Sequence, residues 1–424
     1  MKKYLLPLLA AACLFLGLSI ALRAQGKILI NMDLTQSDHL KAYGIAYWSL
    51  TKGYDVDWLL NYRGGSFMSP YSQAIENECR LRGVSFTAID GATAAQIYAE
   101  VQAQDNNMDV MKLEKAPKIA VYVPPNFQPW DDAVTLALEY AEIPYDKVWD
   151  DDVLKGKLKE YDWLHLHHED FTGQYGKFYA QFSTFPWYIN QVAMYEAKAR
   201  ELGFKKVSEN KKAVARVIQE YVAQGGFMFA MCSATDTYDI ALAAENTDIC
   251  DVMFDGDPPD PDCQEKLDYA KCWAFENFKL VKNPYEYEYS DIDMTPALGG
   301  RPDADYFTLF EFSAKYDPVP TMLTQDHVAV VAGFLGQTTA FKKSLIRKSV
   351  TILGEKQGTE EVKYMHGNFG RGTFTYYGGH DPEDYQHQVG DPPTDLALHK
   401  TSPRYRLILN NVLFPAAKKK QQKT

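Results

Sequence analysis

The sequence has no surplus of basic residues, which argues against binding to polyanions. Its 44 lysines and arginines are outnumbered by 56 aspartates and glutamates, for a net charge of −12. Binding to nucleic acid requires a basic surface that neutralises phosphates, so we expect no nucleic-acid partner. Lysines gather only in a short tail over residues 416–424. Four charges there are too few to hold the chain firmly on an anionic membrane.

The composition lacks the extremes that mark non-globular chains. Hydrophobic residues make up 46% and charged residues 24%, which excludes a disordered, collagen-like or mostly membrane-embedded protein. A length of 424 residues predicts two or three domains. Aromatic residues are frequent at 13%, with 28 tyrosines. Such side chains favour strands and also line grooves that hold sugars or peptides.

Long apolar runs are absent except at the start of the chain. Lys2 and Lys3 precede an apolar run over residues 5–22, and Ala24 follows it. This layout is typical of a signal peptide, and we predict cleavage after about residue 24. An uncleaved membrane anchor is the alternative, because the run is close to the minimum spanning length. We therefore expect an exported protein, periplasmic or secreted, with no membrane insertion after cleavage.

The sequence contains six cysteines but no C-x-x-C pair and no Cys/His spacing of the zinc-finger kind, which argues against a structural zinc site. Export permits disulfides. We expect any disulfide to join two of Cys250, Cys263 and Cys272, with Cys250–Cys263 preferred. Cys232 is predicted to be unpaired, and Cys79 to be a buried core residue.

The chain alternates between predicted strands and helices in two series. The first spans residues 25–112, with strands at 27–32, 57–62 and 84–89 and helices at 37–50 and 69–82. The second spans 117–415 and carries two insertions, at 171–208 and 250–300. This alternation predicts two doubly wound α/β domains with mainly parallel sheets. Ligands of such folds bind at the carboxyl ends of the strands.

Cys232 follows an apolar strand and precedes a helix, with small residues two positions before and after it. A sharp strand-to-helix turn requires small neighbours and lifts the side chain out at the carboxyl edge of the sheet. The helix start lowers a thiol pKa and offers N–H donors for an oxyanion, among them that of Ser233. Cys232 is accordingly a candidate nucleophile. A small, buried, apolar cysteine is the other interpretation.

His380 also follows a predicted strand, in the run Gly-Gly-His-Asp-Pro-Glu. A cysteine nucleophile needs a base, and the base needs an orienting carboxylate. His380 is the candidate base, and Glu383 or Asp381 is the candidate orienting acid. Asp381 is also a candidate for binding the substrate, together with Ser233. A turn built by the glycines and Asp-Pro is the alternative.

A third candidate is the run His165-Leu166-His167-His168-Glu169-Asp170. Alternation along a strand places His165 and His167 on one face. The spacing permits a metal site but does not specify one. We favour a substrate-binding loop that includes His167, His168 and Glu169, and we expect no metal and no cofactor.

The second half of the chain resembles the class I glutamine amidotransferase-like superfamily. The resemblance rests on Tyr-Asp-Trp-Leu-His-Leu at 161–166 and on Tyr-Val-Ala-Gln-Gly-Gly-Phe-Met-Phe-Ala-Met-Cys at 221–232. The segment at 370–383 with that at 402–413 is similar to the end of trehalose-utilisation-type members. The resemblance to this superfamily implies a flavodoxin-like sheet with a strand–Cys–helix elbow. The elbow here is Ala-Met-Cys-Ser-Ala where the amidotransferases carry Gly-x-Cys-x-Gly.

The whole chain also resembles exported bacterial proteins labelled asparagine synthetase B. It lacks the chemistry behind that label, because no Ser-Gly-Gly-x-Asp-Ser loop is present to hold a pyrophosphate. Two functions follow from the sequence. One is a hydrolase or acyl-transferase that uses Cys232 on a small amide or peptide-like substrate. The other is a non-catalytic envelope protein that binds a peptide, a glycan or an assembly partner.

Overall fold

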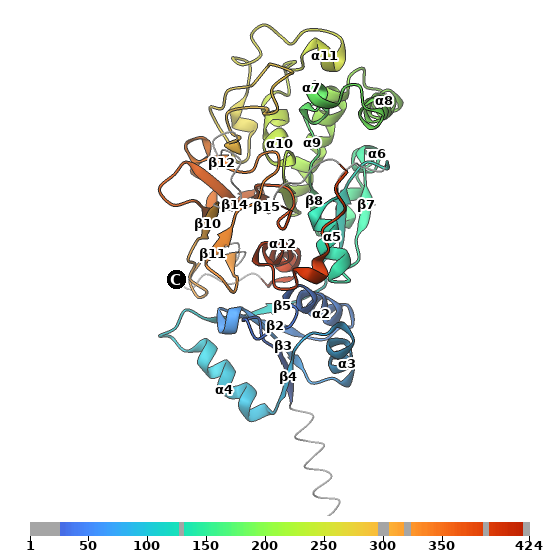
Figure 1. Ribbon diagram of the computed structural model, residues 1–424. Coiled ribbons are helices and arrows are strands. Elements are labelled where there is room, and N and C mark those ends of the chain that lie inside the picture. The colour runs from blue at the N-terminus through green and yellow to red at the C-terminus, as the bar shows by residue number, and fades with distance from the viewer. Residues whose placement is uncertain (1–25, 127–130, 296–304, 318–323, 385–389, 419–424) are drawn as a thin grey trace, which may run out of the picture.

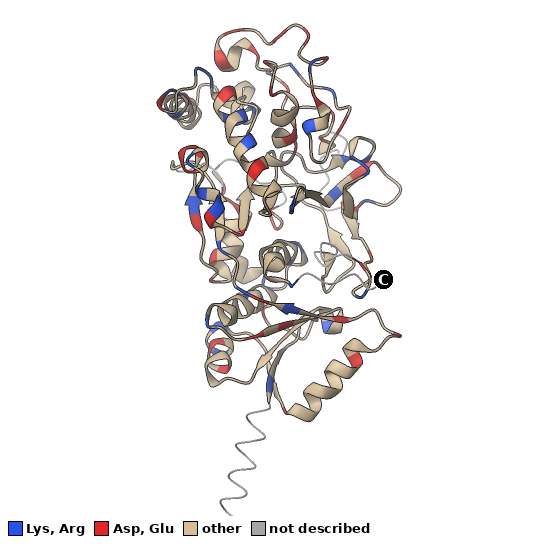
Figure 2. Ribbon diagram, turned by 180° about the vertical axis from the view of Figure 1, so that it is seen from behind, with Lys and Arg blue, Asp and Glu red and all other residues tan. Residues whose placement is uncertain are grey.

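The computed structural model describes residues 26–126, 131–295, 305–317, 324–384 and 390–418 (Figure 1). The predicted signal peptide and the last six residues of the basic tail lie outside these ranges. None of the described helices combines the length and apolar character needed to cross a membrane. Figure 2 shows acidic and basic residues interspersed along the ribbon in this view rather than gathered on one face.

The N-terminal sheet has five strands in the order β4-β1-β3-β2-β5, and every neighbouring pair is antiparallel. The strands are β1 (Lys27–Ile30), β2 (Val56–Leu60), β3 (Ser66–Pro70), β4 (Thr87–Ile89) and β5 (Asp109–Leu113). The helices are α2 (His39–Thr51), α3 (Gln73–Arg82) and α4 (Gly91–Gln102). Up to β4, the chain follows the split βαβ arrangement, in which β3 inserts between the two parallel strands β1 and β2.

The prediction of a parallel N-terminal sheet is wrong, and the reason is a tight hairpin between β2 and β3. Asn61, Gly64 and Gly65 all take left-handed φ values, of 61°, 76° and 88°. The chain therefore reverses at once, and residues 66–70 form a strand that includes the first two positions of the helix predicted over 69–82. The helix begins later, and the Ser72 side chain caps it by accepting from the N–H of Ala74.

The second sheet is mixed, with a parallel core. Its path is β11-β10-β13-β14-β15-β9-β8-β6-β7, and the short β12 pairs with β14. The parallel strands are β6 (Ile119–Tyr122), β7 (Asp146–Val148), β8 (Trp163–Leu166), β9 (Phe227–Met231) and β15 (Gly372–Tyr377). The antiparallel strands are β10 (Tyr306–Leu309), β11 (Val330–Ala332), β12 (Phe341–Lys342), β13 (Thr351–Glu355) and β14 (Glu361–Phe369). The predicted parallel sheet is thus confirmed for the core alone.

Helices cover both faces of this mixed sheet. The helices are α5 (Ala133–Tyr140), α6 (Asp150–Leu154), α7 (Tyr179–Phe182), α8 (Pro186–Glu201), α9 (Val207–Ala223), α10 (Ala234–Ala243), α11 (Val252–Asp255) and α12 (Pro403–Leu413). One apolar core joins α5 and α12 to one face and continues into the N-terminal sheet, while a second joins α9 and α10 to the other face. The helix α12 lies between the two sheets (Figure 1).

Arg406 on α12 connects the two domains through hydrogen bonds. It is fully buried, and it donates to the Tyr43 hydroxyl at 2.9 Å and to the carbonyl oxygen of Met32 at 2.9 Å. It also donates to the carbonyl oxygen of Gly64. The closing helix of the chain is therefore part of the packing of the first domain.

The insertion over 250–300 is held by a buried carboxylate. Asp239 on α10 accepts from the backbone N–H groups of Trp273, Ala274 and Phe275, at 2.7 to 2.9 Å. Burial raises the pKa of Asp239 to about 6. This one side chain anchors the irregular segment to the helix that follows the Cys232 elbow.

Candidate functional site

Three neighbouring strands end together at one edge of the mixed sheet. In the register, Leu166 of β8 lies beside Ala230 of β9, and Met231 of β9 lies beside Tyr377 of β15. His167, Cys232 and the turn before His380 therefore follow directly from adjacent parallel strands. This is the edge at which open α/β sheets bind ligands.

Cys232 occupies the predicted elbow between β9 and α10. Its φ is +52°, a left-handed value that is costly for a residue with a Cβ. Its backbone N–H donates to the carbonyl oxygen of Gly379 at 3.1 Å, which ties the elbow to the turn after β15. Strained backbone of this kind is concentrated at functional sites.

The Cys232 thiol is closed off from solvent. The residue is 3% exposed, and burial raises its pKa to about 12. The backbone N–H groups of Ser233 and Gln337 act in the opposite direction. The carboxyl groups of Asp236 and Asp293 add to the rise. In this state the thiol is protonated at neutral pH.

His167, His168 and His380 form a cluster beside the elbow. One ring nitrogen from each lies within 4.8 Å of those of the other two. The ring centroids of His167 and His380 are 4.4 Å apart, those of His167 and His168 4.8 Å, and those of His168 and His380 5.6 Å. His167 and His380 are buried and His168 is half-buried. The structure thus brings together two predicted candidates that are more than 200 residues apart in sequence.

Asp132 supports this cluster from the loop after β6. It caps α5 by accepting from the N–H groups of Val134 and Thr135. Its carboxylate also lies 3.2 Å from Nε2 of His165 and 3.5 Å from Nδ1 of His167. The histidines keep the pKa of Asp132 well below its usual range despite burial. Sequence reasoning missed Asp132.

His165 belongs to the core of the sheet. It is fully buried, packs against the rings of Trp163 and Phe229, and contacts the carbonyl oxygen of Phe229 through Nδ1 at 3.2 Å. It shares a face with His167, as strand alternation predicted.

The acids after His380 hold the turn in place. Glu383 is paired with Arg404 at 2.5 Å and with His399 at 3.3 Å. Asp381 accepts from the N–H of Glu383 at 2.8 Å and from the hydroxyl of Tyr405 at 3.0 Å. Both carboxylates therefore link the His380 turn to α12 and its surroundings.

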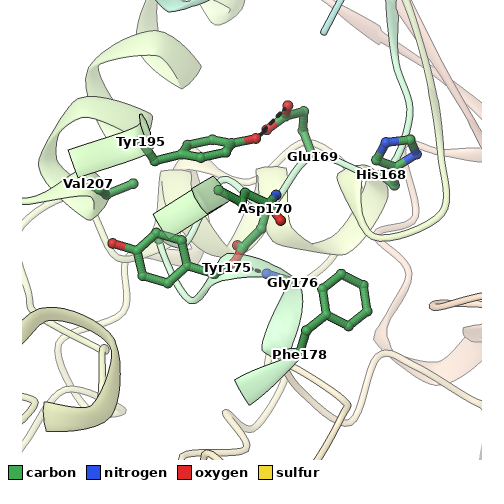
Figure 3. Close-up of a pocket in the computed structure, with 10 residues that line it drawn as sticks. His168, Glu169, Asp170, Tyr175, Gly176, Phe178, Tyr195 and Val207 are labelled. Atoms are coloured by element: carbon green, nitrogen blue, oxygen red, sulfur yellow. Dashed lines mark hydrogen bonds between the residues drawn. The ribbon is translucent and has the colours of Figure 1, made fainter. Parts of the chain in front are cut away.

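The predicted substrate-binding Glu169 lies in a buried charge network. It accepts from the hydroxyl of Tyr195 and lies 3.3 Å from the ammonium of Lys211, which is also 3.1 Å from Asp150. Burial raises the pKa of Glu169. A small cavity runs past Glu169 and Tyr195 to His168, and Figure 3 shows these three residues around it.

The five cysteines of the described chain are all unpaired and buried, so no disulfide holds the insertion at 250–300. The thiol of Cys250 donates to the carbonyl oxygen of Thr172 at 3.2 Å, and that of Cys272 to the carbonyl oxygen of Asp239 at 3.4 Å. Cys79 is buried on α3, which confirms its prediction as a core residue.

Comparison with known proteins does not assign the chain to a family. No family model matches, and no curated protein matches. Among solved structures, the cytoplasmic protein STM1381 from Salmonella typhimurium LT2 matches with a TM-score of 0.37 and 11% identity, over 71% of this chain and 100% of that one. The cytoplasmic protein STM3548 from Salmonella typhimurium matches with a TM-score of 0.34 and 9% identity, over 71% and 99%.

A β-galactosidase from Bacillus circulans sp. alkalophilus matches over 64% of this chain and 29% of its own, with a TM-score of 0.27 and 10% identity. All three likenesses are distant, and none bears on what this chain does.

Proposed function

We propose that the protein is an exported hydrolase or acyl-transferase that acts on a small amide or peptide-like substrate at the carboxyl edge of β8, β9 and β15. The observation that carries this proposal is the left-handed backbone of Cys232, which is tied through its N–H to the turn that presents His380. The resemblance of the sequence to the class I glutamine amidotransferase-like superfamily supports the same chemistry.

In this mechanism Cys232 is the nucleophile and His380 the base. His380 takes the proton of the thiol, the sulfur attacks the substrate carbonyl, and the protonated imidazole then gives its proton to the leaving amine. The N–H groups of Ser233 and Gln337, which already face the thiol, are placed to stabilise the oxyanion. Water releases the acyl group in a hydrolase, and an acceptor amine or alcohol releases it in an acyl-transferase.

The buried thiol requires that substrate binding open the elbow. A closed cysteine with a pKa of about 12 holds little thiolate, so the base must act on it directly once the substrate is in place. Glu383 then keeps the His380 turn in position through its pair with Arg404.

The test is to measure release of ammonia or amine from a panel of small amides and dipeptides with the wild type, Cys232→Ala and Cys232→Ser. Cys79→Ala is the matched control, because Cys79 is also a buried cysteine but lies in the N-terminal domain. Turnover that is lost in both Cys232 variants and kept in the control supports the proposal. Turnover kept by a folded Cys232→Ala variant rules out the thiol as nucleophile.

A second function, a non-catalytic envelope protein that binds a peptide or glycan, is favoured by one observation: the thiol is 3% exposed. In that case iodoacetamide leaves Cys232 unmodified in the folded protein with every member of the panel present. Substrate-dependent alkylation of Cys232, located by peptide mass mapping, would contradict it.

Export has a direct measurement of its own. Expression of the full chain in a bacterium, followed by N-terminal sequencing of the product from the envelope fraction, is expected to begin near residue 25. A cytoplasmic product that retains Lys2 and Lys3 would contradict the proposal that the protein is exported.

A further inference from the structure

We propose that His167, His168 and His380 bind a divalent transition-metal ion of the Zn²⁺ class. The inference goes beyond the proposed function: it shares His380 with that proposal but holds whether or not Cys232 is a nucleophile. It rests on the convergence of three imidazoles from two strand ends of the mixed sheet.

The geometry of the three rings suits a single ion. Their ligand nitrogens lie within 4.8 Å of one another. Around zinc, with bonds of about 2.0–2.1 Å, tetrahedral nitrogen ligands are roughly 3.3 Å apart. The proposal therefore requires the side chains to rotate so that these nitrogens move closer together when the ion binds. Imidazole ligands favour zinc, copper, nickel and iron over magnesium and calcium, which prefer oxygen.

A carboxylate stands behind the cluster in the position that metal-binding histidines commonly require. Asp132 faces Nδ1 of His167 at 3.5 Å, so this ring would bind the ion through Nε2. Carboxylates that accept from the far nitrogen of a ligand histidine fix its tautomer and strengthen it as a ligand. Asp132 is itself held by the N–H groups at the start of α5, so its position is independent of any ion.

The cluster borders a small cavity through one of its three histidines. His168 is half-buried and lines the cavity that also touches Glu169 and Tyr195 (Figure 3). Three protein ligands with an open fourth position are characteristic of catalytic rather than structural zinc. An ion held there lowers the pKa of a bound water and polarises a carbonyl oxygen.

Another group of potential ligands in the described chain is a weaker candidate. Asp248, Cys250 and Asp255 also lie within 4.8 Å of one another. The ammonium of Lys206 already neutralises both carboxylates, at 2.5 and 3.1 Å. The Cys250 thiol donates to a backbone carbonyl oxygen and is held protonated by burial. This group serves as an internal control.

The experiment uses the full chain without an affinity tag that contains histidine. The protein is stripped with a chelator, equilibrated with ZnCl₂ or CoCl₂, and assayed by elemental analysis and titration calorimetry. We expect about one tightly bound ion per chain. With Co²⁺ we expect the visible absorption of a four- or five-coordinate site with nitrogen ligands.

Variants locate the ion. His167→Ala and His380→Ala should each abolish the tight site, and Asp132→Asn should weaken binding by about 10- to 100-fold while stoichiometry is kept. Two controls, Cys250→Ser and His399→Asn, should bind as the wild type does. Circular dichroism checks that each variant is folded.

Absence of a tight ion in the wild type overturns the proposal, as does binding that survives His167→Ala or disappears in Cys250→Ser. The outcome is separate from that of the proposed function. A protein that binds zinc and needs Cys232 for turnover keeps the metal site and the nucleophile, but it must use a base other than His380, whose lone pair is then bound to the ion. A protein that binds zinc and works without Cys232 keeps only the metal site.

Discussion

The backbone N–H of Cys232 donates to the carbonyl oxygen of Gly379, with nitrogen and oxygen 3.1 Å apart. The bond joins two turns that leave adjacent parallel strands, β9 and β15. Both residues have left-handed φ values, 52° for Cys232 and 97° for Gly379. A Cβ on Gly379 would lie 2.4 Å from the ring of Phe334, so glycine is required at that position. The strained backbone of Cys232 is therefore hydrogen-bonded to a residue, Gly379, at which any side chain would clash.

The first prediction concerns that strain. At an ordinary helix position glycine is about 0.5–1 kcal/mol less stable than alanine. At φ +52° the order should reverse, because a left-handed backbone costs a residue with a Cβ about 1–2 kcal/mol. We expect Cys232→Gly to equal or exceed Cys232→Ala in free energy of unfolding, measured by urea denaturation. Ala241→Gly, within α10, is the control and should lower stability. A Cys232→Gly variant clearly less stable than Cys232→Ala would show that the elbow is unstrained.

The second prediction concerns the buried ammonium of Lys211. It lies 3.1 Å from Asp150 and 3.3 Å from Glu169, and all three side chains are at most 4% exposed. Lys211→Met leaves two carboxylates buried without a cation, which should cost about 3–5 kcal/mol at pH 8. The loss should be smaller at pH 5, where a carboxyl group can take up a proton. Denaturant unfolding at both pH values is the measurement.

Lys155→Met is the control for this prediction. Lys155 pairs with Asp151 on the surface and is 71% exposed, so its loss should change stability by less than about 1 kcal/mol. Equal effects of the two substitutions would mean that the Lys211 network is solvated.

The third prediction is a pH dependence set by His366. Burial lowers its pKa to about 3, whereas the unfolded chain has the ordinary value near 6.5. Between these values the unfolded state binds a proton that the native state excludes. Acidification from pH 6.5 toward pH 3 therefore removes up to about 1.4 kcal/mol of stability for each pH unit. His366→Gln should flatten the profile of unfolding free energy by that slope. Parallel profiles for wild type and variant would show that His366 titrates normally.

The fourth prediction concerns the junction between the two sheets. Arg406→Met removes the donors to Met32, Gly64 and Tyr43 and leaves the fully buried carboxylate of Asp326 without its arginine. We expect a loss of at least about 3 kcal/mol and faster proteolysis near residues 114–118, which connect the sheets. Arg80→Met, at a side chain that is 66% exposed, should have neither effect. A cleavage pattern identical to that of wild type would show that Arg406 does not hold the two sheets together.

Local patterns in the sequence predicted much of the second domain. Apolar runs bounded by turns mark the strands near 118–123, 161–167, 227–231 and 372–377, and helical periodicity over 209–224 marks α9. One face of this helix was predicted to be apolar, and its residues are buried except for Val217, which is half-buried: Val214, Val217, Ile218, Tyr221 and Val222. These features succeed because each depends on side chains close together in the chain. The elbow at Cys232 belongs to the same class, since a strand, a small-residue turn and a helix follow one another directly.

Strand pairing in the first domain could not be predicted in this way. The pattern of strands and helices suggested parallel pairing, but the hairpin at residues 61–65 places β3 between β1 and β2. Which strands become neighbours depends on where a tight turn returns the chain, and the residue pattern of one strand does not record its partner. The class of each element was therefore more predictable than the direction of the sheet.

The features of the candidate site also fall into those that the local sequence predicted and those that depend on the tertiary structure. The sequence alone determined that His167, Cys232 and His380 each follow a strand, because apolar strand and polar turn are adjacent in the chain. Only the tertiary structure decided that His380 contacts His167 rather than standing apart, that Asp132 stands behind them, and that Glu383 pairs with Arg404. The physical reason is that the order of strands in the sheet brings together strand ends that are more than 200 residues apart in the sequence. Burial of the Cys232 thiol follows from loops packed over that edge of the sheet.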